Sequence, residues 1–227
     1  MFLPNELIFI FQATTVAIFT LTALWLGKEA LTATVCLYCI LSNLFVTKQI
    51  TLFGLSVVST DVFAVGSILG LNLMQEYFGL SAARKAIGIN AVLLLFYLAS
   101  TQLFLAYAPN SFDTMNQHFI PVLTHMPRII IASALVYFFV QLFDAQLYRF
   151  FKTFFKNRFL VGRNVMSLLI SQLLDTVLFT FAGLYGIIQS PFHVIIISYT
   201  IKIIVIMCSA PFVSFAKRII TTDKTQP

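Results

Sequence analysis

The chain has 227 residues, of which 59% are hydrophobic and only 10% are charged. Soluble globular domains carry about 25% charged residues, and a mean hydropathy of +0.95 is typical of a chain whose main solvent is lipid. The composition therefore argues against a soluble domain. The net charge of +6 could indicate a nucleic-acid partner, so the positions of the basic residues along the chain are considered below.

Seven apolar segments are each about long enough to cross roughly 30 Å of hydrocarbon as a helix. In chain order they are 7–26, 30–47, 57–78, 87–108, 128–150, 165–188 and 193–216. Helices are predicted because backbone groups in hydrocarbon need internal partners, and the segments lack the alternation of a barrel. The residues before the first segment, MFLPNE, include no basic residue, so it is interpreted as a retained helix rather than a cleaved signal.

The basic residues sort by loop. With seven helices and the N-terminus outside, eleven of the fourteen Lys and Arg fall on the inner side: Lys28, Arg84, Lys85, Arg149, Lys152, Lys156, Arg158, Arg163, Lys217, Arg218 and Lys224. This positive-inside pattern predicts a multi-pass membrane protein with a cytoplasmic C-terminus. Basic and aromatic residues alternate in 149–163, as in some RNA-binding patches, but a loop at the membrane surface explains them better. No nucleic-acid partner is expected.

Several polar residues remain inside the apolar segments, where ionisable groups are costly and indicate function. They form stripes at helical spacing: Tyr137, Gln141 and Asp144; Gln172, Asp175 and Phe179; Tyr199 and Lys202. Asp175 lies near the centre of its segment, and Gln141 and Lys202 lie at similar depth. A polar cluster near the midplane is where transporters bind substrates.

Two structural alternatives stay open for these residues. Lys202 could neutralise Asp175 or Asp144 as a buried pair that holds helices together. Asp61 and Glu76 lie nearer the ends of their segment, where they could be interfacial or capping groups.

Other motifs carry less information. Cys36 and Cys39 have C-x-x-C spacing but no second pair, so they are interpreted as packing residues. The outer loop 109–127 contains Asp113, His118 and His125, which could form a lid or a metal site but are more often ordinary loop residues. Because no Walker, H-E-x-x-H or G-x-S-x-G motif occurs, we expect no enzyme activity, metal or cofactor.

Five blocks of the chain resemble one known family, the queuosine precursor transporters. In chain order the blocks are SNLFVTKQ (42–49), NLMQEYFGLSAARKAI (72–87), RIIIASALVYFFVQLFDAQLYRFFK (128–152), SQLLDTVLFTFAG (171–183) and SYTIKIIV (198–205). The resemblance covers about 41–215. One departure is Asn72, where the family usually has an aspartate.

The resemblance implies an inner-membrane importer of 7-deazaguanine bases, namely queuine and its biosynthetic precursors, which serve tRNA modification. It also implies a helical bundle similar to the substrate-binding subunits of vitamin importers. By position, it assigns substrate binding to Asn43, Glu76, Gln141, Asp144, Gln172, Asp175 and Lys202. The expected organisation is an extra N-terminal helix (1–29), a bundle of six core helices (30–217) and a cytoplasmic tail (218–227).

The chemistry of a 7-deazaguanine suggests roles for these residues. Its guanine-like edge presents N–H donors beside a carbonyl acceptor, which Asp175 and Gln172 are expected to read. Asp144 or Glu76 would hold the cationic amine of some substrates. The aromatic rings available for stacking on the base are Tyr137, Phe179 and Tyr199.

Three rival functions differ in what they require. A substrate-binding subunit of a multi-part vitamin importer would need a separate ATPase module. A membrane-embedded enzyme would need a metal-binding motif or a nucleophile with its base, and an assembly protein would not need buried carboxylates. A homo-oligomer or a partner subunit is compatible with the sequence.

Overall fold

The computed structural model describes residues 4–154 and 160–204, without some side chains inside the helices. In chain order the elements are α1 (Asn5–Leu26), α2 (Lys28–Phe45), β1 (Gln49–Leu52), β2 (Leu55–Val58), α3 (Asp61–Ala106), α4 (Asn116–Leu123), α5 (Met126–Phe154), α6 (Leu160–Phe179) and the π-helical turn η1 (Thr180–Leu184). A last helix is described over Pro191–Ile204.

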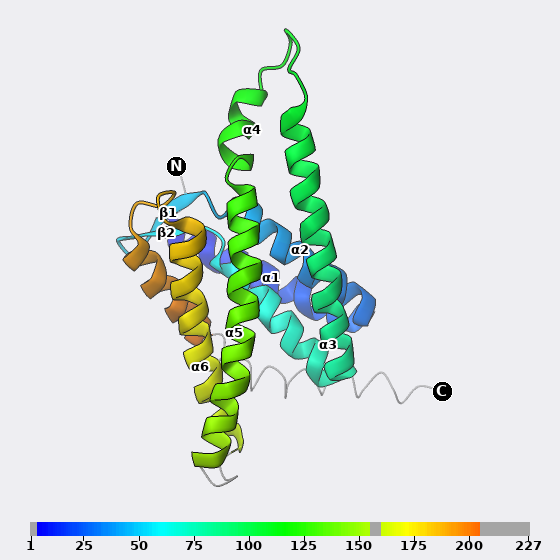
Figure 1. Ribbon diagram of the computed structural model, residues 1–227, viewed down its shortest axis with the longest axis vertical. Helices are drawn as coiled ribbons and strands as arrows, with labels where there is room; N and C mark the ends of the chain where they lie inside the picture. The colour runs from blue at the N-terminus through cyan, green and yellow to red at the C-terminus, as the bar shows by residue number, and fades with distance from the viewer. Residues whose placement is uncertain (1–3, 155–159, 205–227) are drawn as a thin grey trace.

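Two long helices define the shape of the molecule. α5 and the second part of α3 run along its long axis, and α6 lies beside α5 (Figure 1). α1, α2 and the first part of α3 form a separate packed group that crosses the long helices (Figure 1). The described chain is therefore mostly helical, as the apolar segments predict, and it also contains one small hairpin that they do not predict.

α1, α2 and the first part of α3 pack closely because glycines line their contact. Gly27, with a φ of 112°, lets the chain reverse directly from α1 into α2. Gly66 and Gly70 are spaced four apart on α3, and a Cβ at Gly70 would lie 2.5 Å from Val35 Cγ2 of α2. Such small residues let helix backbones approach in membranes. The core between these helices contains Leu24, Leu31, Leu73 and Met74.

Gly79 interrupts α3. Its φ of 85° and ψ of 166° are not helical, and the helix resumes directly after it. The sequence predicts two helices, 57–78 and 87–108, with a loop between them. That loop prediction is wrong, because residues 81–86 (SAARKA) are mostly strong helix formers and continue the second part of α3.

An antiparallel hairpin replaces the predicted start of the third helix. Gln49 pairs with Val58 and Leu52 pairs with Leu55, around a turn in which Phe53 (φ 50°) and Gly54 (φ 78°) both have positive φ. Tight hairpin turns favour such φ values because they match the strand twist. The prediction that a helix begins at residue 57 is wrong. Val57 and Val58 belong to β2, and both are buried, with exposed fractions of 0% and 4%.

Contacts with two distant segments hold the hairpin in place. Asn5 Nδ2 donates to Thr51 O at 2.9 Å, and Phe53 N donates to Glu6 Oε1 at 3.0 Å. Gln49 bridges to the segment after η1, donating from Nε2 to Ile187 O and accepting at Oε1 from Gln189 N. The start of α1, the hairpin and the segment after η1 therefore lie at one end of the fold.

A second core joins α4, α5, η1 and the last helix. Its buried members include Leu123, Met126, Ile129, Leu184 and Val194. α4 lies within 109–127, which the sequence analysis describes only as a loop. Asp113 Oδ1 accepts the backbone N–H groups of Met115 and Asn116, at 2.8 and 3.0 Å, which fixes the start of α4.

The later helices differ from prediction mainly at their ends. The predicted segment 165–188 corresponds to α6 and η1, which end at Leu184, before Gly186 with its φ of 80°. The last helix begins at Pro191, where a missing N–H costs nothing, against a predicted start at 193. Its predicted continuation to 216 lies outside the described residues beyond 204.

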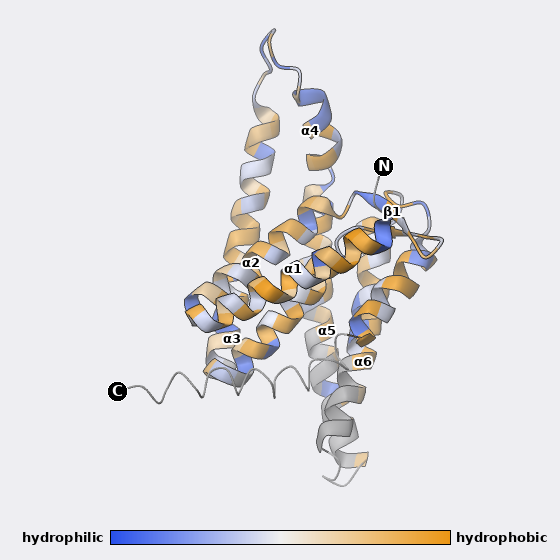
Figure 2. Cartoon of the chain, turned by 180° about the vertical axis from the view of Figure 1, so that it is seen from behind, coloured by the Kyte–Doolittle hydropathy of each residue, from blue (hydrophilic) through white to orange (hydrophobic). Residues whose placement is uncertain are grey.

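Within the part of the chain that the structure describes, three helices are long and apolar enough to cross a membrane: Asn5–Leu26, Ser81–Ala106 and Asn116–Tyr137. Shorter apolar helices cover Asp61–Gln75, Leu169–Leu184 and Pro191–Ile204. Large apolar side chains are exposed, including those of Phe11, Phe19 and Phe96. Figure 2 shows that hydrophobic residues make up most of α1. Such continuous apolar surfaces are expected where lipid, rather than water, surrounds the helices. The division into seven helices stays a prediction.

The close approach at Gly70 predicts a difference between two Gly→Ala variants of α3. Alanine favours helix over glycine by about 1 kcal/mol, but Gly70→Ala also forces a methyl against the stiff Val35 side chain. Overpacking typically costs about 1–3 kcal/mol. We expect Gly70→Ala to lower the melting temperature in detergent and Gly88→Ala, where nothing lies within 4 Å, to raise it slightly. An equal rise in both variants would contradict this packing.

Candidate functional site

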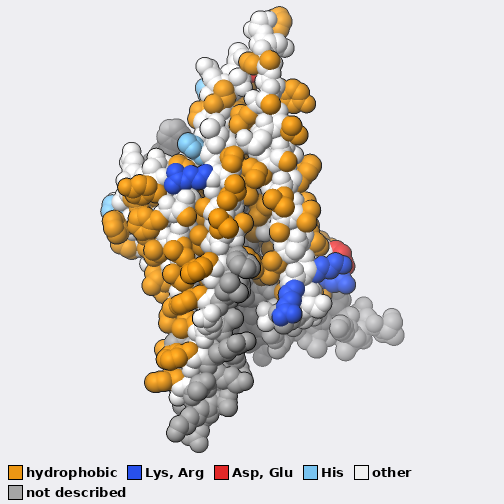
Figure 3. Space-filling model, in the orientation of Figure 1, with side chains coloured by type: hydrophobic (Ala, Val, Ile, Leu, Met, Phe, Trp, Pro, Cys, Tyr) orange, Lys and Arg blue, Asp and Glu red, His pale blue; other side chains and the backbone are white. Residues whose placement is uncertain are grey.

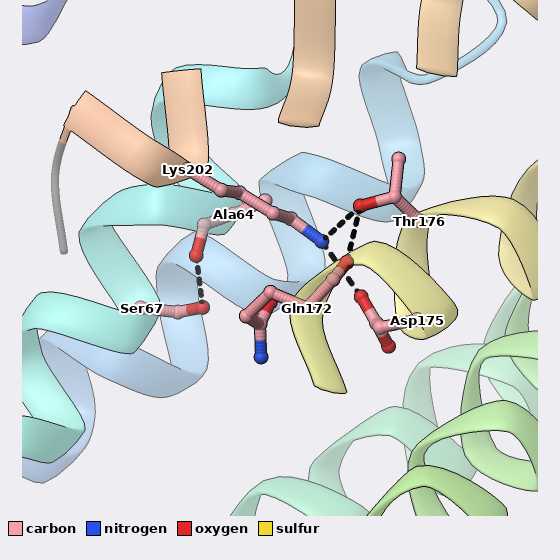
Figure 4. A network of polar contacts seen from close by, with 6 residues as sticks. All are labelled: Ala64, Ser67, Gln172, Asp175, Thr176 and Lys202. Atoms are coloured by element: carbon pink, nitrogen blue, oxygen red, sulfur yellow. Dashed lines mark hydrogen bonds and ion pairs between the residues drawn. The ribbon is translucent and has the colours of Figure 1, made fainter. Parts of the chain in front are cut away.

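A buried lysine organises the polar interior. Lys202 of the last helix is 8% exposed, and its Nζ donates to Asp175 Oδ2 at 2.7 Å and to Thr176 Oγ1 at 3.0 Å, both on α6 (Figure 4). Thr176 Oγ1 donates in turn to the Gln172 carbonyl at 2.7 Å. Charge-assisted hydrogen bonds of this length are strong, and in a dry environment they are screened little. The contacts join the last helix to α6.

α3 adds a second carboxylate to this cluster. Asp61, the first residue of α3, is 7% exposed. Its carboxyl group lies near the Ser198 hydroxyl and within range of the charge of Lys202, both on the last helix. Three helices thus bring two carboxylates to one ammonium group, and the Lys202 cluster (Asp61, Gln172, Asp175, Thr176, Ser198 and Lys202) has an excess of acceptors.

Two acceptor atoms of the Lys202 cluster are left open. Among the described residues, Asp61 Oδ2 and Gln172 Oε1 are buried side-chain oxygens that no hydrogen-bond donor reaches. A buried polar atom without a partner costs about 1–3 kcal/mol, so native structures rarely keep one without a reason. The arrangement fits a ligand or water that presents N–H or O–H donors.

The structure brings together three of the predicted site residues, Gln172, Asp175 and Lys202. Lys202 pairs with Asp175, one of the two carboxylates that the sequence analysis names as its possible partner. The Asp175 side chain is 28% exposed against 10% for Lys202, so the carboxylate is the more accessible partner.

Other predicted residues are engaged locally. Asn43 is buried on α2 and donates from Nδ2 to Cys39 O, one turn earlier, at 2.7 Å. The Tyr199 hydroxyl donates to Leu169 O of α6 at 3.3 Å. Phe179 packs against the core around Leu184, and Tyr137 is 39% exposed on α5.

Three predicted residues are placed only by their backbone. Glu76 lies on α3, and Gln141 and Asp144 lie on α5, but their side chains are outside the described residues. Their assignment to a substrate site stays a prediction.

The sequence analysis misses Thr176 and Ser198 and treats Asp61 as a residue of the interface or a cap. Asp61 lies in the first turn of α3, near the end of its segment as the sequence analysis describes, but it is buried and lies close to Ser198 and Lys202 of the last helix. Helical spacing could have identified Ser198, because it precedes Lys202 by four residues and so lies on the same helix face.

The cysteines form part of a smaller polar contact. Cys36 and Cys39 are free thiols on α2, and Cys36 is buried. Cys39 lies near the polar side chains of Ser67 and Asn90 of α3. Their packing role agrees with the sequence interpretation.

Comparison with known proteins places the chain in a family. A family model described as "Putative vitamin uptake transporter" matches residues 57–216, which include the whole Lys202 cluster but not Asn43. A relative from Bacillus subtilis (strain 168), described as "Probable queuosine precursor transporter", is 31% identical over 203 residues, 88% of this chain and 85% of the relative. No solved structure matches the chain. The matches confirm the resemblance of the five sequence blocks, and the chain belongs to the putative vitamin uptake transporter family.

Proposed function

We propose that the chain imports queuosine precursors, 7-deazaguanine bases, across the bacterial inner membrane. The name of the Bacillus relative supports the substrate class. The observation that carries the site is the pair of open, buried acceptors, Asp61 Oδ2 and Gln172 Oε1, beside the Asp175–Lys202 ion pair. The guanine-like edge of the base supplies N–H donors for these acceptors.

The chemistry matches group by group. The ring N–H and the exocyclic amine of the base donate to carboxylate and amide oxygens, here those of Asp175 and Gln172, while Lys202 donates to the ring carbonyl. Asp61 Oδ2 accepts a further donor. In a dry site a wrong ligand leaves these atoms unpaired, which gives strong discrimination.

The base also offers two flat faces. Tyr199 precedes Lys202 by three residues, so its half-buried ring lies on the same helix face. We assign stacking to Tyr199, with Phe179 and Tyr137 as further candidates on α6 and α5. Stacking on an aromatic side chain is worth about 1–3 kcal/mol per base. Asp144 or Glu76 would hold a cationic amine on the substrate.

The expected topology, with six core helices, an extra N-terminal helix and the N-terminus outside, is part of the proposal. Two groups of contacts support it. Asn5 and Glu6 contact the hairpin, which also contacts the segment after η1, so these three expected outer segments lie together. Lys28 and Lys85, both expected inside, line one groove. The boundaries 1–29, 30–217 and 218–227 follow from this topology.

The direct test is uptake into liposomes that contain the purified chain alone. Queuine, its aminomethyl and cyano precursors, guanine and biotin are compared as substrates. Uptake of a deazaguanine without added ATP supports the importer. Tight binding without any uptake would favour the alternative, a substrate-binding subunit that depends on a separate ATPase module.

A double-variant cycle separates the two roles of the ion pair. Asp175→Asn alone is expected to abolish uptake, since Lys202 then loses its nearest carboxylate and the base loses its acceptor. Breaking one side of a buried pair costs about 3–5 kcal/mol. Adding Lys202→Gln to Asp175→Asn removes the unpaired charge and is expected to restore the amount of protein in the membrane but not uptake. Recovery of uptake in the double variant would assign the pair to helix packing alone.

Gln172 offers a second test because its amide oxygen has no described partner. Gln172→Leu removes a buried open acceptor, so the melting temperature is expected to stay or rise. Binding of the deazaguanine, measured by calorimetry in detergent, is expected to weaken about 5- to 150-fold, the equivalent of about 1–3 kcal/mol. The control is Thr200→Val, an exposed hydroxyl that donates only to Ile196 O of its own helix. Unchanged affinity in Gln172→Leu would remove Gln172 from the site.

A further inference from the structure

A groove of about 570 Å³ opens between α2 and α3 at the Gly79 interruption. Its polar rim consists of Lys28 and Glu29, at the start of α2, and Lys85, in the first turns after Gly79. Its interior is apolar and includes Cys36, Met74 and Phe78. No residue of this groove belongs to the Lys202 cluster, so it is a separate feature of the molecule.

The rim is positively charged. Lys28 Nζ lies 3.6 Å from Glu29 Oε1, and both side chains are more than half exposed, so this ion pair is weak. Lys85 and its neighbour Arg84 are exposed, which leaves three cations to one anion around the groove mouth. Figure 3 shows basic side chains gathered at the lower end of α3, with one acidic group beside them.

An apolar channel leads away from this rim along α3. A second hollow of about 430 Å³ shares Lys85, Ile89 and Leu93 with the groove and adds Gly88 and Val92. Gly88 has no side chain and nothing within 4 Å, so it forms the floor of the hollow. Val92 is 66% exposed, on a helix of which only 6% is buried, so the hollow faces the hydrocarbon region.

We propose that this groove binds an anionic phospholipid. The phosphate of the headgroup lies between Lys28 and Lys85, and one acyl chain follows Ile89, Val92 and Leu93. The ligand needs both an anionic headgroup and an acyl chain, because the lysines lie at one end of a continuous apolar channel. Basic pockets at the cytoplasmic face are known to suit acidic headgroups.

A nucleobase does not fit this groove. Reading a base edge needs several converging polar groups, whereas apart from its charged rim this groove is lined mainly by apolar residues, with Thr32 and Ser81 as the uncharged polar ones. A second copy of the chain would bring its own lysines against these, which charge repulsion disfavours. The inference is independent of the proposed transport activity.

The test is thermal melting of the full chain in mild detergent, with phosphatidylglycerol or phosphatidylcholine added at equal concentration. A ligand that binds only the folded state raises the melting temperature. We expect phosphatidylglycerol to raise it by several degrees more than phosphatidylcholine, and glycerol 3-phosphate to have no effect. An equal rise with both lipids, or a rise with glycerol 3-phosphate alone, would overturn the proposal.

Variants on the rim and along the groove locate the effect. Lys28→Gln and Lys85→Gln replace exposed side chains and are expected to fold normally while losing the preference for phosphatidylglycerol. Ala33→Phe, at an exposed position on the groove wall, is expected to weaken binding of either lipid. Lys48→Gln, an exposed lysine outside the groove, is the matched control. An undiminished preference in Lys85→Gln, or a dimer that this variant dissociates, would contradict the lipid site.

Trp25 gives an independent readout. It is the single tryptophan of the chain, 63% exposed, and lies three residues before Lys28. In phosphatidylcholine bilayers with a small fraction of brominated lipid, brominated phosphatidylglycerol is expected to quench Trp25 more than brominated phosphatidylcholine. The excess is expected to vanish in the Lys28→Gln/Lys85→Gln variant, and its persistence there would count against the groove.

Discussion

The burial of the Lys202 ammonium group is the constraint on which the rest of the described fold depends. An isolated ion in a dry interior costs several kcal/mol even after relaxation, so it must be met by charges and hydrogen bonds. Asp175 and Thr176 on α6, and Asp61 at the start of α3, supply them. Because these partners come from different helices, satisfying one charge fixes how α3, α6 and the last helix lie together.

The same constraint gives the site its chemical character. Two carboxylates and one amide oxygen exceed what a single ammonium and one hydroxyl can satisfy, so Asp61 and Gln172 each keep an open acceptor. A purely structural ion pair would gain from closing those contacts within the protein. That these two acceptors stay open inside an apolar chain argues for a ligand rich in hydrogen-bond donors.

The sequence predicts the helices well because hydrophobic length is a strong signal in membranes. It predicts Asp175 and Lys202 at similar depth, because helical rise converts residue number into height. The sequence-based prediction of helix boundaries fails where the backbone conformation of one or two residues ends or redirects a helix. Phe53 and Gly54 turn an apolar stretch into a hairpin, and Gly79 breaks α3 without a loop. Asp61 is missed as a cluster member because its position near the end of a segment resembles that of an interfacial group, and only the packing of the last helix buries it.

α3 connects the two candidate sites through one rigid segment. Its first part begins at Asp61 in the Lys202 cluster and ends at Phe78, which lines the groove at Gly79. At about 1.5 Å per residue these ends are about 25 Å apart. Gly66 and Gly70 let this segment pack closely against α1 and α2, whereas the part after Gly79, beyond the buried Ala83 and Ala86, has few buried residues. The non-helical Gly79 therefore separates the packed first part of α3, which begins in the Lys202 cluster, from its more exposed second part. The phospholipid proposed for the groove would contact both parts.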